Sequence, residues 1–372
     1  MECIAGRARV VSPWEVEVDG RRLSARAIVI ATGAAPTVPA LPGLDGVDYL
    51  TTETVWGLRE RPRRLLVLGG GPVGCELAQA FARVGSTVTI VQRAAHLLPR
   101  EDADAAALVA QAFAADSINV LTGHRGVRVE ARDGGHMLVC EDAAGDAVEI
   151  GFDRLLLALG RTPRVHGFGL EELGVRIDTH GQVAADASMQ TSIPTIRVCG
   201  DAAGPFQFTH AAAHQAWFAA VNALLAPWWS FRASHAVLPW CTFTDPEVAR
   251  VGLSETEARE RGLAVEVTRY ELADLDRAIA DGDTTGFVKV LTTPGRDRIL
   301  GATIVGRHAG ETIAEFVLAM KHGLGLRKLL ATIHVYPTWM EANKAVAGAW
   351  QRAHAPQRAL RLMERLQRWR RN

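Results

Sequence analysis

Residues 65–85 constrain the fold of this chain more than any other stretch. Four apolar residues at 65–68 are typical of a buried strand, and they lead directly into Gly-Gly-Gly-Pro-Val-Gly at 69–74. A helix-compatible run from Cys75 to Arg83 follows, and a second strand-like run covers 87–91. This order of strand, G-x-G-x-x-G and helix predicts a βαβ unit that binds a dinucleotide. The alternative is a glycine-rich turn in an unrelated α/β unit.

The motif glycines have separate physical tasks in such a unit. Gly69 permits the tight turn, Gly71 lets the backbone approach a pyrophosphate, and Gly74 lets the helix pack closely on the strand. The first turn of the helix offers unpaired N–H groups and the positive end of its dipole to phosphate.

Length and composition indicate how many domains the chain can form and which kinds of partner it is expected to bind. A chain of 372 residues, 48% of them hydrophobic, is long enough for two or three domains with sizeable cores. Its formal net charge of zero argues against nucleic acid as a main partner. Five scattered cysteines without a C-x-x-C pattern indicate reduced thiols and no metal site. No long apolar run and no signal peptide are visible, so we expect a cytoplasmic protein.

Further motifs occur in order around the glycine unit. One strand ends at Thr32-Gly33, a second at Gly160-Arg161 and a third at Gly200-Asp201. The runs FTDPEVARVGLSE at 243–255 and YPTWMEA at 336–342 follow. Together these motifs resemble the pyridine nucleotide–disulfide oxidoreductases, flavoproteins that include dihydrolipoamide dehydrogenase, glutathione reductase and mercuric reductase. The resemblance extends to about residue 355.

The resemblance implies an α/β fold with two dinucleotide-binding domains and an α+β C-terminal dimerisation domain. The two dinucleotide-binding domains would be a truncated FAD domain and a complete, Rossmann-like NAD(P) domain. The resemblance also implies a homodimer that forms through residues 236–350. The expected division is 1–55 for the remnant of the FAD domain, 56–163 for the NAD(P) domain, 164–235 for the second part of the FAD domain, 236–355 for the dimerisation domain and 356–372 for a basic amphipathic tail.

The resemblance also implies a flavin site. Asp201 would accept hydrogen bonds from the ribityl hydroxyls of FAD, and Gly200 would give the cofactor close access. The N-terminus of the following helix would point at the flavin pyrimidine edge, where its dipole stabilises negative charge. We interpret His210 as a helix-start residue near the ring, with a proton carrier as the alternative. The flavin candidates are therefore Gly200, Asp201, Thr209 and His210, and the strand-end residues Thr32, Gly33 and Gly160 are further cofactor-binding candidates.

The choice of nicotinamide cofactor is read at the end of the second strand of the βαβ unit. A carboxylate there would bind the ribose 2′-hydroxyl of NAD, whereas an arginine suits the 2′-phosphate of NADP. This strand ends at Arg93, the loop adds Arg100, and no acid occupies 91–93. A guanidinium holds phosphate through charge-assisted bonds, so NADP is predicted over NAD; two solvated arginines are the alternative.

Two carboxylates and one phenol complete the list of candidate residues. By resemblance Glu76 lies near the nicotinamide, and the alternative is a favourable carboxylate near a helix N-terminus. Better-known family members have His-Pro-Thr near the C-terminus, where this chain has Tyr336-Pro337-Thr338 with Glu341 after them. The catalytic candidates are therefore Tyr336 and Glu341. A phenol titrates near ~10 and is a poor base at neutral pH, but mercuric reductase-like members also carry tyrosine there. His334 is interpreted as a packing or surface residue.

Some features of the family are missing from this sequence. No second G-x-G-x-x-G precedes Gly69, no C-x-x-x-x-C pair is present, and the C-terminal cysteine pair of mercuric reductases is absent. We expect an N-terminally shortened FAD-dependent oxidoreductase of the mercuric reductase-like branch. In the intact enzyme, hydride would pass from NADPH to flavin, and electrons would then pass to a disulfide supplied by the missing segment or to a small-molecule acceptor; without the C-terminal cysteine pair, mercury is not the expected substrate. The chain alone is expected to be nearly colourless and inactive. The alternative is a non-catalytic nucleotide-binding and dimerisation fragment that lacks flavin.

The last residues form a basic segment. Residues 357–372 contain six arginines and one glutamate, and on a helix Leu362, Met363, Leu366 and Trp369 share a face. Such a helix predicts weak contact with an anionic membrane surface, and the alternative is a solvated helix that packs one stripe on its own domain.

Overall fold

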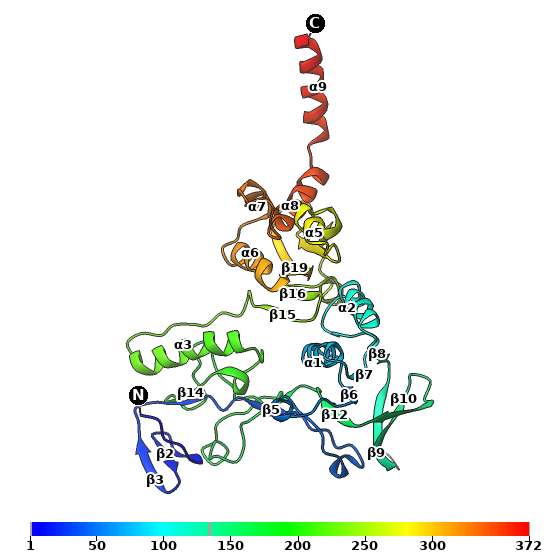
Figure 1. Ribbon diagram of the computed structural model, residues 1–372. Helices are drawn as coiled ribbons and strands as arrows, with labels where there is room; N and C mark the ends of the chain where they lie inside the picture. Colours follow the sequence, from blue (N-terminus) through cyan, green and yellow to red (C-terminus); the bar gives the residue numbers. More distant parts are fainter. Residues whose placement is uncertain (1, 133–134, 372) are drawn as a thin grey trace. The chain divides into compact units, whose positions relative to one another are not determined.

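The computed structural model describes residues 2–132 and 135–371, which divide into two compact units (Figure 1). Unit 1 is built from the chain up to Pro39, Thr51–Glu53 and Leu159–Ala236, and unit 2 from Ala40–Leu50, Thr54–Ala158 and the chain from Val237 onward. The sequence-based division at residue 55 groups Ala40–Leu50 with the N-terminal segment. In the structure this segment belongs to unit 2, because Leu44 and Val47 are buried in the same apolar cluster as Leu66.

Unit 1 consists of small sheets and one long helix. Its strands are β1 (Ala8–Ser12), β2 (Glu15–Val18) and β3 (Arg21–Ser24) in an antiparallel sheet, the parallel pair β4 (Ile28–Ile30) and β14 (Ile196–Val198), and the antiparallel pair β5 (Ala34–Pro36) and β13 (Arg161–Pro163). Asp19 and Gly20, both with positive φ, form the hairpin turn between β2 and β3. A 3-10 turn at Gly200–Ala202 and helix α3 (Thr209–Leu225) follow β14.

The first part of unit 2 is the predicted dinucleotide-binding fold. Its parallel sheet has the order β12-β6-β7-β8, formed by Arg154–Leu157, Arg64–Leu68, Thr87–Gln92 and Asn119–Thr122. The helices are α1 (Pro72–Arg83) and α2 (Ala103–Ala115), and an antiparallel sheet contains β9 (Arg125–Arg132), β10 (Gly135–Glu141) and β11 (Ala147–Phe152). The continuous apolar run of β6 is buried, as expected for a parallel strand covered on both faces.

The second part of unit 2 is an α+β fold. Its antiparallel sheet has the order β15-β16-β19-β18-β17, formed by Pro239–Thr242, Glu247–Gly252, Ile299–Gly306, Phe287–Thr292 and Glu266–Glu271. The helices are α4 (Glu255–Glu260), α5 (Asp276–Asp281), α6 (Ala309–Lys321), α7 (Leu326–Ala331), α8 (Glu341–Ala353) and α9 (Gln357–Arg371). A capping box between Ser254 and Glu257 starts α4. Among the described residues, no helix combines the length and apolar character needed to cross a membrane.

A buried ionic cluster joins these two parts of unit 2. Lys289 lies in the middle of β18, whose six residues are all buried. Its Nζ lies 2.9 Å from Asp102 Oδ2, 2.9 Å from Asp104 Oδ1 and 2.8 Å from Glu255 Oε1. Asp102 precedes α2, whereas Glu255 begins α4, so one ammonium group binds carboxylates from both parts. A buried charge needs such partners because water is not available to solvate it.

A second buried pair lies at the same junction. Arg250 Nε on β16 lies 2.9 Å from Glu101 Oε2, and both side chains are at most 5% exposed. The Trp240 indole N–H donates to the other oxygen of Glu101 at 2.7 Å, and its ring lies under the Arg250 guanidinium. Burial raises the pKa of Glu101 in spite of the neighbouring Arg250.

The cluster makes stability depend on pH. Burial alone would raise the pKa of Asp102, but hydrogen bonds from Lys289 and from the backbone N–H groups of Thr256 and Glu255 lower it from 3.8 to about 2. A carboxylate whose pKa is lower in the folded state stabilises the fold above its unfolded pKa. This contribution, about 2 kcal/mol for a shift of this size, is lost as the pH falls from about 4 to about 2.

We predict that Lys289→Met destabilises unit 2 by about 3–5 kcal/mol, since it leaves buried carboxylates without their cation. The matched control is Arg154→Met, which breaks the ion pair with Asp48, whose side chain is 78% exposed. That change is expected to cost less than about 1 kcal/mol. Denaturant unfolding followed by tryptophan fluorescence measures both, and equal losses would contradict the importance of the cluster.

Candidate functional site

The glycine turn after β6 packs against backbone at Gly74 and has free space at Gly71. Gly69 has a φ of 112°, which favours glycine, and its N–H donates to the carbonyl of Val91 at 2.9 Å. A Cβ on Gly74 would lie 1.9 Å from the carbonyl oxygen of Gly69, so no side chain fits there. A Cβ on Gly71 would meet no atom within 4 Å. The backbone at Gly71, the residue before α1, is therefore accessible to a ligand.

Arg93 follows the strand that contacts this turn. Leu68 and Val91 pair in register, and the Gly70 N–H donates to the side chain of Gln92 at 3.3 Å. Arg93, the next residue, is exposed. Among the described residues, the guanidinium groups of Arg93 and Arg100 form no hydrogen bond or ion pair, although the Arg100 carbonyl accepts one from Arg250. The guanidinium of Arg93, directly after β7, is therefore available to bind an anionic ligand.

Glu76 has a structural partner. Because α1 begins at Pro72, Glu76 is the fifth helical residue and lies outside the first turn, where a helix dipole acts most strongly. Its Oε1 accepts the backbone N–H of Phe243 at 2.9 Å, just after β15. Burial raises the pKa of Glu76, and this hydrogen bond opposes the increase. The carboxylate therefore links α1 to the C-terminal sheet.

Two predicted strand ends meet in unit 1. β4 and β14 are parallel, with Ile30 opposite Val198, so Thr32-Gly33 and Gly200-Asp201 follow neighbouring strands at one edge of the pair. The Thr32 hydroxyl donates to the carbonyl of Arg164 at 2.6 Å, and a Cβ on Gly33 or Gly160 would meet no atom within 4 Å. Carboxyl ends of parallel strands are common ligand positions in α/β proteins.

Arg161 holds Asp201 and was not among the predicted site residues. Its Nε lies 3.4 Å from Asp201 Oδ2, and the Asp201 side chain is 19% exposed. The same guanidinium donates to the carbonyl of Ala34 at 2.5 Å and to the Thr52 hydroxyl at 3.2 Å. Its position directly after Gly160, at a strand end, was the signal in the sequence that could have identified it.

Helix α3 begins at Thr209, so Thr209 and His210 lie in its first turn. Thr209 and His210 are exposed, and the His210 ring stacks on Phe208 with centroids 5.3 Å apart. Gln215, a buried residue of α3 that sequence reasoning missed, accepts the Gly200 N–H at 2.8 Å and donates to the carbonyl of Gly204 at 3.1 Å. It fixes the first turns of α3 beside the Gly200-Asp201 turn.

The two catalytic candidates bind different partners. Tyr336 is 66% exposed, and its hydroxyl donates to Asp276 Oδ2 at 3.0 Å. This hydrogen bond raises the pKa of Tyr336, so the phenol keeps its proton at neutral pH. Glu341 begins α8 and accepts the backbone N–H of Thr338 at 3.3 Å.

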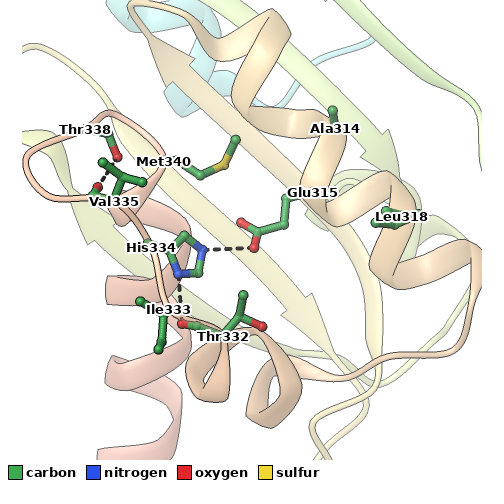
Figure 2. A pocket seen from close by; sticks show the side chains of 9 residues that line it. All are labelled: Ala314, Glu315, Leu318, Thr332, Ile333, His334, Val335, Thr338 and Met340. Atoms are coloured by element: carbon green, nitrogen blue, oxygen red, sulfur yellow. Dashed lines mark hydrogen bonds and ion pairs between the residues drawn. The ribbon is translucent and has the colours of Figure 1, made fainter.

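His334 lies beside a mostly apolar cavity of about 590 Å³ (Figure 2). Its side chain is 4% exposed, with Nε2 2.9 Å from Glu315 Oε1 and Nδ1 3.0 Å from the carbonyl of Thr332. Asn343 donates to the other oxygen of Glu315 at 3.0 Å. These contacts agree with a packing role for His334, and they anchor the segment that leads to Tyr336.

The cysteines other than the exposed Cys3 are shielded from solvent and are not placed for thiol chemistry. All five are free, and burial raises the pKa of Cys75 to about 12 and also raises that of Cys199 and Cys241. Since the thiolate is the reactive form, these buried thiols are inert. Among the described residues, no group of three or more His, Cys, Asp or Glu side chains could hold a metal ion.

Comparison with known proteins identifies the family. Residues 1–216 match the model of the pyridine nucleotide-disulphide oxidoreductases, and residues 238–347 match the dimerisation domain of that family. A dihydrolipoyl dehydrogenase from Thermus scotoductus is 37% identical over 94% of this chain and 75% of its own length. A mercuric reductase from Bacillus cereus is 36% identical over 92% of this chain, which spans only 54% of that protein.

Solved structures show the same fold. The HOCl-induced flavoprotein disulfide reductase RclA from Escherichia coli superposes with a TM-score of 0.84 at 27% identity, over 93% of this chain and 78% of its own. LpdA from Mycobacterium tuberculosis gives a TM-score of 0.82 at 26% identity, over 92% and 76% of the two chains. The glycine turn lies within the first family match, and the C-terminal sheet lies within the second. The chain belongs to the pyridine nucleotide-disulphide oxidoreductases, a family of flavin-dependent oxidoreductases.

Proposed function

We propose that this chain binds NADPH in preference to NADH at the turn before α1. The observation that supports the proposal is the exposed Arg93, without a partner among the described residues, directly after the residue that contacts the glycine turn. Open space at Gly71 fits a pyrophosphate, and the free N–H groups of α1 would bind it. Arg93, with Arg100 assisting, would hold the 2′-phosphate through charge-assisted hydrogen bonds.

We further propose that residues of unit 1 contact FAD. The flavin would supply a two-electron relay from NADPH to a disulfide or small-molecule acceptor, as the functions of the relatives suggest. Asp201, oriented by Arg161, would accept hydrogen bonds from the ribityl hydroxyls, and the open space at Gly33 and Gly160 fits close approach of a ligand. The exposed N-terminus of α3, with Thr209 and His210, would stabilise negative charge on the flavin ring.

The C-terminal part is proposed to form a homodimer. Ile333 and Val335 are 93% and 76% exposed next to the cavity in Figure 2, and Leu318 on α6 is also exposed. An apolar patch of this kind marks an interaction site, and the match of 238–347 to a dimerisation domain supports a second copy as its partner. Tyr336 and Glu341 would then lie at the interface. The phenol of Tyr336, which keeps its proton, would act as a hydrogen-bond donor and not as a base.

For the cofactor preference, we predict that Arg93→Glu weakens NADPH binding about tenfold to a hundredfold, because it replaces attraction to the 2′-phosphate with repulsion. NADH binding should change much less. The matched control, Arg63→Glu, makes the same charge change just before β6, at the opposite end of that strand. Titration of both nucleotides measures the constants, and equal affinity of the unchanged chain for NADPH and NADH would refute the preference.

Alanine substitutions at Gly71 and Gly74 distinguish the effect of the glycine turn on folding from its effect on NADPH binding. Gly71→Ala should leave the thermal unfolding temperature nearly unchanged, since φ is −79° and the added methyl group meets no atom, yet it should weaken NADPH binding at least about tenfold by occupying the approach to the pyrophosphate. Gly74→Ala should lower the unfolding temperature, because its methyl group would overlap a backbone oxygen. Unchanged nucleotide affinity in Gly71→Ala would place the nucleotide elsewhere.

For the dimer, we predict that light scattering gives twice the 40.1 kDa mass of the chain. Ile333→Asp should shift the protein toward the monomer, because a carboxylate would be desolvated in the interface. Leu263→Asp places the same charge at another exposed position, 48% accessible in the free chain, and should leave the mass unchanged. A monomeric mass for the unchanged chain at micromolar concentration would exclude this interface.

A further inference from the structure

Helix α9 exposes an apolar face that nothing else in the described chain covers. It follows α8 after His354, Ala355 and Pro356, and every residue from 360 to 371 is exposed. Leu362, Met363, Leu366 and Trp369 are between 50% and 75% exposed. The structure therefore does not support packing of this stripe on its own domain, which was the alternative for the tail.

These four side chains occupy one side of the helix. At about 100° per residue, positions 362, 363, 366 and 369 fall within roughly a third of a turn. Leu360 lies about a third of a turn from the centre of this face. Arg365 borders the face, and Arg370, in the last turn of the helix, falls within it between Leu366 and Met363. Glu364, the one acid of the segment, pairs with Arg368 at 3.0 Å on the other side. The helix is amphipathic, with arginines bordering and opposing the apolar side.

The positive charge is concentrated in this segment. Residues 357–372 have six arginines and one glutamate, whereas the whole chain has no net charge. Anionic lipid headgroups attract such a segment, and the long arginine side chains reach headgroups while the helix rests at the acyl boundary. Tryptophan also favours this boundary, because its ring is largely apolar and its N–H is polar.

We propose that α9 lies on the surface of an anionic membrane, with Leu362, Met363, Leu366 and Trp369 inserted at the headgroup boundary. Pairing of two α9 helices through this face would bring Arg365 and Arg370 of both copies together, and like charges would oppose it. Nucleic acid would use the arginines but would leave the apolar face in water. An anionic membrane surface would bind the arginines through its headgroups and would also cover the apolar side chains. This assignment is independent of the nucleotide and flavin proposals.

The test is flotation of the full chain with vesicles. Binding to vesicles that contain about one-quarter phosphatidylglycerol in phosphatidylcholine is expected to be at least about tenfold tighter than binding to phosphatidylcholine alone. Raising the salt from about 0.1 M to about 0.5 M should weaken it, because salt screens the attraction. Equal binding to both vesicles, or binding to neither, would overturn the proposal.

Two matched substitutions examine the orientation of the helix. Leu366→Ser, on the apolar face, should weaken vesicle binding about fivefold to tenfold, whereas Leu360→Ser should change it less than about twofold. Both leucines are about half exposed in the free protein, so neither change removes internal packing, and an unaltered melting curve serves as the control. Equal effects of the two changes would overturn the proposed orientation.

The other occupants of this face are distinguished in the same series. If deletion of 357–372 lowers the oligomeric mass and leaves vesicle binding unchanged, α9 packs on a second copy and the proposal is wrong. If a DNA duplex competes fully with anionic vesicles and both leucine variants bind the vesicles like the unchanged chain, the arginines bind polyanions in general, and insertion of the apolar face is refuted.

Discussion

The buried charges around Lys289 set the arrangement of unit 2. An ammonium group in the middle of a fully buried strand is stable only when carboxylates surround it. These come from Asp102 and Asp104 at the start of α2 and from Glu255 at the start of α4. Arg250 and Glu101 repeat the same arrangement nearby. Since unpaired buried charge is costly, a different packing of the C-terminal sheet on the dinucleotide-binding part would be strongly disfavoured. The contact of Glu76 with the backbone of Phe243 depends on the same packing.

In the proposed nucleotide site, the backbone of the glycine turn and the side chain of Arg93 have separate roles. Gly69 and Gly74 are needed for the turn itself, because one adopts a positive φ and the other touches backbone. Gly71 has no such structural need, and its missing side chain leaves room for a ligand. Arg93 adds charge at the neighbouring strand end. In the proposed site, folding and nucleotide specificity therefore depend on different residues, and substitution can test them separately.

Tyr336 and the buried cysteines all keep their protons, which makes them poor bases and poor nucleophiles. A hydrogen bond to Asp276 keeps the Tyr336 phenol protonated, and burial keeps Cys75, Cys199 and Cys241 in the thiol form. These groups are suited to packing or to hydrogen-bond donation, and not to nucleophilic attack. In the proposed reaction, electrons therefore pass from the nucleotide and flavin to an acceptor other than these thiols.

Local patterns in the sequence were enough to determine the βαβ unit, the turn at 69–74, the strand ends and the amphipathic character of 357–372. Each depends on residues close together in the chain, whose spacing matches a strand, a turn or a helix. Only the tertiary structure decided which polar side chains form hydrogen bonds and ion pairs with one another. Arg161 orients Asp201, Gln215 holds Gly200, and Lys289 gathers three carboxylates. The partners in these contacts come from separate elements, and burial makes each polar group depend on the other, so no local pattern could reveal them.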